Sequence, residues 1–570
     1  MSSLRKLFSD SVIYGLSSIV GKFLNYLLVP LYTYKIAAAS GGYGVITNIY
    51  AYTALLQVIL TFGMETTFFY YANKLRREAV DEEAGRRAAG RVFTTSLVAV
   101  TAVSALFMAL VLLLNGAIAP ALGYQAHPEY IQVMAAVVSI DAIQAILFAL
   151  LRLQGRAWKF AALKLSFIIA NIGLNLFVFL LAPQMAADPA FDWLMGWYDP
   201  ADQIGYVFKI NLICTTTVTL AFIPELRQLR YGFDAKLLRP MLRYAWPLLL
   251  LGIVGILNQV ADKIIYRFLV PGPEGEVQLG IYGACIKIAM IMAMITQAFR
   301  YAYEPFVFGA GKDAKSKETQ AQVMKYFVIF TLLAFLAVTG YLDLLKYVID
   351  SDYWQGLRAV PIVMAAEILM GIYFNLSFWY KLNEETWWGA IFSTVGCLAL
   401  LAVNIIFVPR IGYMACAWGG VAGYGVCVLL SYFVGRRRNP VPYPLKSIGG
   451  YVLLTAALYT VSEILDPQTL VWQLVLGTAL LLVYVAVVVL CERDLTAPLL
   501  KRLHLVPVAL LCIVAATLAS CSKQCRCYRY DGVVEVYSKE ELDQRGTHCT
   551  ALESENRGLK YSLCEYSYWD

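Results

Sequence analysis

Eleven ionisable residues interrupt long apolar runs of this 570-residue chain, and they are the side chains best placed to do chemistry. An ionisable side chain at the centre of a lipid-facing helix costs about 2.5–3.5 kcal/mol. If all of them faced lipid, the total would exceed ordinary fold stability. Most must therefore line a watery cavity or pair internally. They are Lys22, Glu65, Asp141, Lys164, Lys209, Asp262, Lys263, Lys287, Arg300, Glu304 and Glu367.

Four of the bases are candidates for binding an anionic cargo. Lys and Arg suit phosphate because their N–H groups replace the water that phosphate oxygens lose. Lys164 and Lys209 lie near the ends of apolar runs, so their side chains could instead extend to the lipid headgroups. We predict a cargo-binding set of Lys22, Lys263, Lys287 and Arg300.

The acids are candidates for coupling to an ion or proton gradient. Glu65 and Glu304 lie near predicted cytoplasmic ends, so bonding to Lys or Arg in the loops is their structural alternative. Asp262 is adjacent to Lys263, and neighbouring residues do not share a helix face, so we expect each to need its own partner. The predicted coupling set is Glu65, Asp141, Glu304 and Glu367.

Composition makes this an integral membrane protein. Hydrophobic residues form 60% of the chain, charged residues only 15%, and the mean hydropathy is +0.63. Soluble domains are about 45–50% apolar and about 25% charged. The net charge of +7 comes from short basic clusters between apolar runs and does not suggest nucleic acid. With no phosphate-binding loop of the Walker A type and three dispersed His, we predict a transporter, not an enzyme, with no cofactor or metal.

The apolar runs predict about fourteen membrane-spanning helices, since about 20 apolar residues cross the hydrocarbon. They are residues 11–34, 43–71, 92–115, 130–153, 160–182, 206–223, 245–270, 279–306, 326–349, 359–380, 388–408, 412–434, 448–465 and 470–491.

Charge asymmetry between the loops predicts the orientation. The loops at 116–129, 183–205, 271–278 and 466–469 contain no Lys or Arg, whereas the alternate loops carry basic clusters such as Arg436, Arg437 and Arg438. Positive loops stay inside. We therefore expect a multi-pass protein whose N-terminus and fourteenth span both end in the cytoplasm.

Two sets of residues recur along the chain at nearly constant offsets. Tyr43-Gly44 and Glu65 match Tyr282-Gly283 and Glu304, about 239 positions later. In a second set, the residues Arg152, Leu153, Trp158 and Asn175 match Lys381, Leu382, Trp387 and Asn404, about 229 positions later. Chance among common membrane residues is the alternative. Both offsets place the second half six spans after the first, which gives parallel repeats with a site between them. The predicted domains are two six-helix lobes (1–226 and 227–440), an extra helix pair (441–495) and a tail segment (496–570).

Several motifs in order resemble the polysaccharide (Wzx-type) flippases of the multidrug/oligosaccharidyl-lipid/polysaccharide exporter superfamily. They are the residues at 14–18 (Tyr-Gly-Leu-Ser-Ser), 28–33, 262–263, 280–283, 297–300 and 404–412. The resemblance covers about residues 1–490. It implies an all-α alternating-access transporter with twelve plus two spans and a central cavity.

The resemblance also implies a function. The cargo would be an undecaprenyl-pyrophosphate-linked O-antigen, capsule or exopolysaccharide unit, moved across the bacterial cytoplasmic membrane with an ion gradient. Its implied partners are the lipid-linked oligosaccharide, membrane lipid and, as an option, a polysaccharide polymerase complex. The alternatives are a multidrug/cation antiporter or a peptidoglycan-precursor flippase of the same superfamily, and then a polysaccharide polymerase or ligase.

The tail departs from this resemblance. After Lys501-Arg502 an apolar run at 505–518 leads to Leu-Ala-Ser-Cys, like a bacterial lipoprotein signal that would lipidate Cys521. A fifteenth span is the alternative, and both place the polar tail outside. Four further cysteines predict up to two disulfides in three connectivities, with zinc as the alternative. They are Cys525, Cys527, Cys549 and Cys564.

Overall fold

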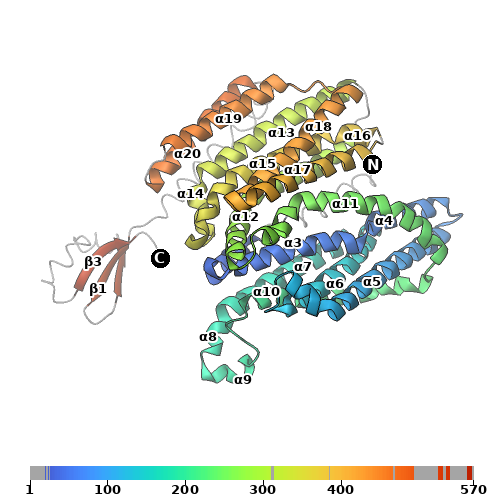
Figure 1. The fold of residues 1–570 in the computed structure, drawn as a ribbon, viewed down its shortest axis with the longest axis horizontal. Coiled ribbons are helices and arrows are strands. Elements are labelled where there is room, and N and C mark those ends of the chain that lie inside the picture. The colour runs from blue at the N-terminus through green and yellow to red at the C-terminus, as the bar shows by residue number, and fades with distance from the viewer. Residues whose placement is uncertain are drawn as a thin grey trace. The chain divides into compact units, whose positions relative to one another are not determined.

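The computed structural model describes Val20, Leu24, residues 26–309, 314–383, 385–465 and 469–492, and three strands in the tail (Figure 1). Lys22, Cys521 and Cys549 lie outside the described residues. The chain divides into two compact units, Met1–Tyr484 and Val485–Asp570.

Twelve described helices are long and apolar enough to cross a membrane, or thirteen if α10 and the short helix after it, bent by 47°, form one span. They coincide with the predicted second to fourteenth spans, whereas most of the first lies outside the described residues. The first helices are α2 (Leu28–Lys35), α3 (Gly42–Thr61), α4 (Met64–Glu78), α5 (Glu82–Ala121), α6 (Pro128–Leu153), α7 (Ala157–Leu176, continued by a π-helical turn), α8 (Ala182–Ala186), α9 (Asp192–Met195) and α10 (Gln203–Leu220).

The later helices begin after a 3₁₀ segment, Ile223–Tyr231, whose successor α11 is capped by the Asp234 carboxylate on the backbone N–H groups of Lys236 and Leu237. They are α11 (Ala235–Leu269), α12 (Pro273–Gly309), α13 (Ala314–Gly340), α14 (Leu342–Leu345), α15 (Val360–Leu376), α16 (Phe378–Leu382), α17 (Trp387–Ile411), α18 (Met414–Arg438), α19 (Leu445–Leu465) and α20 (Leu470–Cys491).

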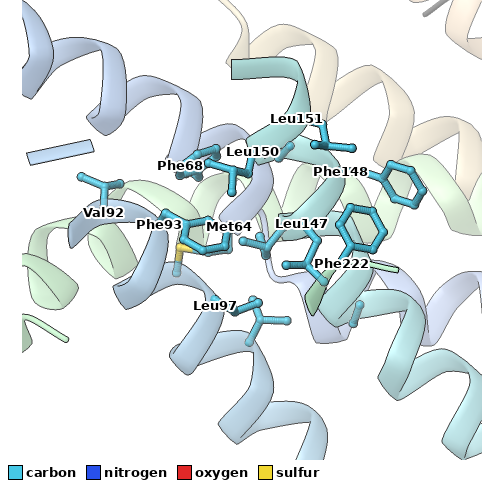
Figure 2. Packing of buried hydrophobic residues seen from close by; sticks show 14 of the residues in the cluster. Met64, Phe68, Val92, Phe93, Leu97, Leu147, Phe148, Leu150, Leu151 and Phe222 are labelled. Atoms are coloured by element: carbon cyan, nitrogen blue, oxygen red, sulfur yellow. The ribbon is translucent and has the colours of Figure 1, made fainter. Parts of the chain in front are cut away.

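Helices α2 to α10 form the first group, in which α3 to α7 and α10 pack around a buried apolar core. Figure 2 shows Phe68, Phe93 and Leu147 pointing toward one another from α4, α5 and α6. Phe148 meets Phe222 edge to face, with ring centroids 4.9 Å apart. Offset and edge-to-face pairs of this kind add about 0.5–1.5 kcal/mol beyond the area they bury.

Helices α11 to α18 form a second group that packs through small residues. At Gly396 of α17, a Cβ would lie 2.7 Å from the carbonyl oxygen of Gly423 in α18. Small residues let helices approach closely in a membrane, where no hydrophobic driving force brings them together. Helix α19 packs on α13, and Gly477 of α20 lies against Gly340 of α13.

The two groups meet where α3 packs on α11 and α12. A Cβ on Gly44 would lie 1.9 Å from the carbonyl oxygen of Glu276 and 3.0 Å from the backbone nitrogen of Gly280. Gly283 in turn packs against Thr47. The two segments that repeat in the sequence, Tyr43-Gly44 and Tyr282-Gly283, therefore belong to the same helix crossing.

Large apolar side chains face outward from the helices. Leu113 is 80% exposed and Leu453 is 72% exposed, and only 11% of the most apolar window of α20 is buried within the protein. Apolar surface on this scale requires lipid as solvent.

The second unit contains a small antiparallel sheet. Its strands are β1 (Gln524–Arg529), β2 (Val534–Ser538) and β3 (Tyr561–Ser567), in the order β2-β1-β3. These strands were not predicted from the sequence.

We predict that Gly44→Ala destabilises the helical unit by at least about 1–3 kcal/mol, the usual cost of overpacking, because the methyl group would collide with backbone. Thermal unfolding of the purified protein in detergent measures this. Gly173→Ala in α7 is the matched control, since a Cβ there meets nothing within 4 Å. Equal unfolding temperatures for the two variants would contradict the tight crossing.

Candidate functional site

A cavity of about 1110 Å³ lies between the two helix groups. Its wall combines residues of α2, α3, α7 and α10 with residues of α11, α12 and α15 to α18. The charged residues of this wall are four bases and two acids, all from the second group: Asp262, Lys263, Lys287, Arg300, Glu367 and Lys381.

The first group contributes a wall without charge among its described residues. It is aromatic and polar, and two of its hydroxyl groups are held in place. Tyr32 donates a hydrogen bond to Asn175 at 2.8 Å, and the Tyr50 hydroxyl accepts one from Asn211 at 2.9 Å. The polar and aromatic members of this wall are Tyr32, Tyr43, Thr47, Tyr50, Phe167, Asn171 and Asn211.

Asp262 and Lys263 pair with each other, so the expectation of separate partners is wrong. The Lys263 Nζ lies 3.0 Å from both carboxylate oxygens of Asp262 and also donates to the Gln259 carbonyl. The four-carbon Lys stem bends back across the helix surface, which spacing rules for short side chains ignore. Tyr282 donates a further hydrogen bond to Asp262 at 3.2 Å.

Glu367 of α15 presents a different situation. Its Oε2 atom is buried and has no hydrogen-bond partner among the described residues. An ionised carboxylate in such a place is expensive unless a proton or a cation neutralises it. Glu367 thus lies on the cavity wall with one buried carboxylate oxygen that accepts no hydrogen bond from the described residues, and its coupling role stays a prediction.

The remaining bases spread along the wall. Lys287 is half-buried and has no acidic or hydrogen-bonding partner among the described residues. Arg300 and Lys381 both lie over the Phe374 ring, at 4.9 and 4.7 Å from its centroid. Lys381 was not predicted as a site residue because it follows directly after the predicted span at 359–380. Its match to Arg152 was the one signal in the sequence that could have singled it out.

Glu65 and Asp141 do not line the cavity. Glu65 forms an ion pair with Arg152, which agrees with the alternative that Glu65 bonds a nearby basic residue. Asp141 lies 3.4 Å from the Thr215 hydroxyl, with Lys164 as its electrostatic partner. Helix α12 contains Glu304, whose side chain is outside the described part.

A polar chain nevertheless connects Asp141 to the cavity. The Thr215 hydroxyl lies within hydrogen-bond distance of Asp141 and, at 3.3 Å, of the Asn211 amide oxygen. Asn211 donates to Tyr50, and both of these residues line the cavity. Because the Thr215 hydroxyl has a single proton, it donates to Asp141 or to Asn211 at any one time, so the two contacts are alternatives.

One set of contacts between the two groups lies at the helix ends that loop charges predict to be external, and another joins α4 to the start of α11, where Tyr71 donates to the Pro240 carbonyl at 3.1 Å. Arg267 of α11 donates to the Gly123 carbonyl at 2.8 Å, lies 4.0 Å from the centroid of the Tyr124 ring and pairs with Glu276. Nearby, Tyr353 donates to the Ile36 carbonyl at 2.6 Å. The contacts of Arg267 and Tyr353 join the two helix groups at the predicted external end.

Solved structures of other membrane proteins share this fold. No family model matches the chain, and no curated protein matches it. A solved structure of the lipid II flippase MurJ in an inward closed conformation matches 85% of this chain and 100% of its own, with a TM-score of 0.65 and 14% identity. An inward-facing multidrug resistance MATE family transporter of the MOP superfamily matches 73% of this chain and 94% of its own, with a TM-score of 0.54 and 15% identity.

The fold is that of alternating-access transporters. The prediction of an all-helical, multi-pass transporter fold is thus confirmed for the helical unit, which shares its architecture with a flippase and with a drug transporter. At these identities the likeness concerns the fold alone, and the cavity must supply the argument about cargo.

We predict that Arg267→Ala widens access to the cavity at the predicted external end, because it removes the hydrogen bond to Gly123 and the cation–π contact with Tyr124 together. A cysteine at Gln259, which lines the cavity, should then react faster with a membrane-impermeant thiol reagent added from the side on which Gly123 lies.

The matched control is Arg87→Ala, which removes an exposed ion pair with Glu83 far along the sequence from this contact. Unchanged labelling of the Gln259→Cys protein in the Arg267→Ala background would show that Arg267 does not restrict access at this end.

Proposed function

We propose that this protein is a flippase that moves undecaprenyl-pyrophosphate-linked oligosaccharide units across the bacterial cytoplasmic membrane. In this proposal its N-terminus is cytoplasmic, residues 1–226 and 227–440 are the two lobes, residues 441–495 add a helix pair and residues 496–570 form an accessory tail. Energy would come from an ion gradient, and the exported unit would pass to a polymerase complex.

The charged wall of the cavity carries the proposal. Four bases and two acids line it, and Lys263 already neutralises Asp262. Among the described lining residues, the bases therefore outnumber the acids by two. Basic side chains in a confined, poorly hydrated space favour an anionic group, and pyrophosphate offers several strong acceptor oxygens.

The uncharged wall suits the remainder of such a cargo. Tyrosine rings provide rigid apolar faces for sugar rings, and Asn171 and Asn211 provide amide groups for sugar hydroxyls. The similarity of the fold to a lipid II flippase supports a lipid-linked cargo at the level of architecture.

Two other transport functions fit the fold equally well. A drug/cation antiporter is favoured by the acidic pair Asp262 and Glu367 among aromatic lining residues, and a peptidoglycan-precursor flippase would need the same basic wall. The excess of bases favours either flippase over cation export. A polymerase or ligase is the least supported alternative, because the similar structures are transporters.

Ion coupling belongs to two acids in this proposal. Glu367 has a buried, unpartnered oxygen on the cavity wall, and Asp141 reaches the wall through Thr215 and Asn211. Binding of a cation or proton at either acid removes a negative charge close to the cargo site. Glu65 and Glu304 keep their predicted coupling role only as weaker candidates, since Glu65 is held by Arg152.

We predict that Lys287→Ala lowers export of surface polysaccharide at least about tenfold in a complemented deletion strain. A hydrogen bond to a charged group contributes about 1.5–3 kcal/mol, and 1.4 kcal/mol is tenfold. The matched control is Lys209→Ala, which removes a base within α10 that pairs with Asp202 and does not line the cavity. Normal export by the Lys287→Ala strain at equal protein level would exclude Lys287 from cargo binding.

Arg300 tests the kind of contact made. Arg300→Ala should abolish export, whereas Arg300→Lys should restore it if charge alone matters and fail to restore it if guanidinium binds phosphate in a bidentate manner. Full activity of Arg300→Ala, combined with increased sensitivity of the deletion strain to organic cations, would favour the drug antiporter.

We predict that Glu367→Gln folds normally but loses dependence of transport on the ion gradient, because the amide keeps the shape of a neutral carboxylic acid and cannot release a proton or hold a cation. Export is measured before and after the gradient is collapsed with an ionophore. Glu385→Gln is the control, since Glu385 pairs with Arg438 outside the cavity. Retained gradient dependence in Glu367→Gln would refute the coupling role.

A further inference from the structure

The strand register in the tail places two cysteines at opposite positions. Strands β1 and β3 are antiparallel neighbours, and Cys527 lies opposite Cys564. Opposite residues in such a pair have Cα atoms about 4.5 or about 5.5 Å apart. A disulfide joins Cα atoms about 4.4–6.8 Å apart, so both kinds of pair meet the requirement.

The same register argues against the competing pairing on these strands. Cys525 lies opposite Tyr566 on β3 and opposite Tyr537 on β2. It is therefore two positions from the partner of Cys564, and such diagonal neighbours are about 7–8 Å apart. A Cys525–Cys564 bond would need the sheet to shift by two residues.

A sheet of this size also needs a covalent link. The described strands are only six, five and seven residues long. Domains with so little core usually depend on disulfides or a metal. The sequence places the tail beyond an apolar run that begins on the predicted cytoplasmic side, and disulfides persist outside the cytosol.

We propose that Cys527 and Cys564 form a disulfide that joins β1 to β3, and that the tail therefore lies in an oxidising compartment. The bond selects one of the three connectivities that cysteine counting left open. It does not depend on the transport function, because it concerns the second unit alone.

The sequence offers a direct test, because Arg526 separates the two cysteines of β1. Trypsin cuts after Lys523, Arg526 and Arg529, which puts Cys527 in the peptide 527–529 and Cys525 in 524–526. Cys564 falls in 561–570. The full-length protein in intact membranes is treated with an alkylating reagent, denatured in its presence and digested without reduction, and the peptides are identified by mass spectrometry.

The expected result is a linked species of 527–529 with 561–570 that disappears on reduction. The free cysteines of the helices, such as Cys416 and Cys427, should be alkylated in the same digest, which controls for oxidation during handling. Cys527→Ser should release Cys564 for alkylation, and Cys491→Ser, at an exposed free cysteine of α20, should not.

Two results would overturn the proposal. One is a linkage of 561–570 to 524–526 or to the peptide containing Cys549. The other is alkylation of Cys527 and Cys564 as separate peptides, which is the result expected of a zinc-bound or reduced tail.

Discussion

The architecture depends on the cost of placing charge in hydrocarbon. Each ionisable side chain within a span must find a partner or water, because lipid offers neither. Lys263 forms an ion pair with Asp262, and Arg152 forms one with Glu65. Asp141 accepts a hydrogen bond from Thr215 and interacts electrostatically with Lys164. Four bases and two acids of the second helix group line one cavity, and this imbalance gives the described cavity wall its basic character.

The cavity in turn depends on how closely the two helix groups approach. Gly44 allows α3 to contact the backbone of α12. Arg267 of α11 binds the Gly123 carbonyl and the Tyr124 ring and so joins the two groups. The start of α11 also contacts α4, where Tyr70 stacks on Tyr244 with ring centroids 4.6 Å apart, so the described residues of the two groups are joined at two places in this conformation.

The sequence predicted those parts of the structure that depend on solvent and on periodicity. Apolar run length located the second to fourteenth spans, because hydrocarbon thickness fixes the length of a crossing helix. The repeat of Tyr43-Gly44 as Tyr282-Gly283 identified two segments that pack at the same helix crossing, and the two repeated halves stay a prediction. Apolar patterning gives the depth of a residue in the membrane but not the direction that its side chain takes. It could not distinguish Glu367, on the cavity wall, from Asp141, behind it, nor foresee the bend of Lys263 onto Asp262. Lys381 was missed because it lies one residue beyond the predicted span at 359–380, and the tail sheet was missed because its strands are too short to show a period.

The central claim, that the basic wall receives a pyrophosphate-linked lipid, can be tested most directly by ligand-dependent thermal stability of the purified full-length protein. Undecaprenyl pyrophosphate should raise the unfolding temperature, uncharged undecaprenol should not, and the difference should shrink with added salt because screening weakens charge contacts. The Lys287→Ala protein should lose most of the stabilisation. Stabilisation by an organic cation such as tetraphenylphosphonium, with no difference between the two undecaprenyl lipids, would contradict the account.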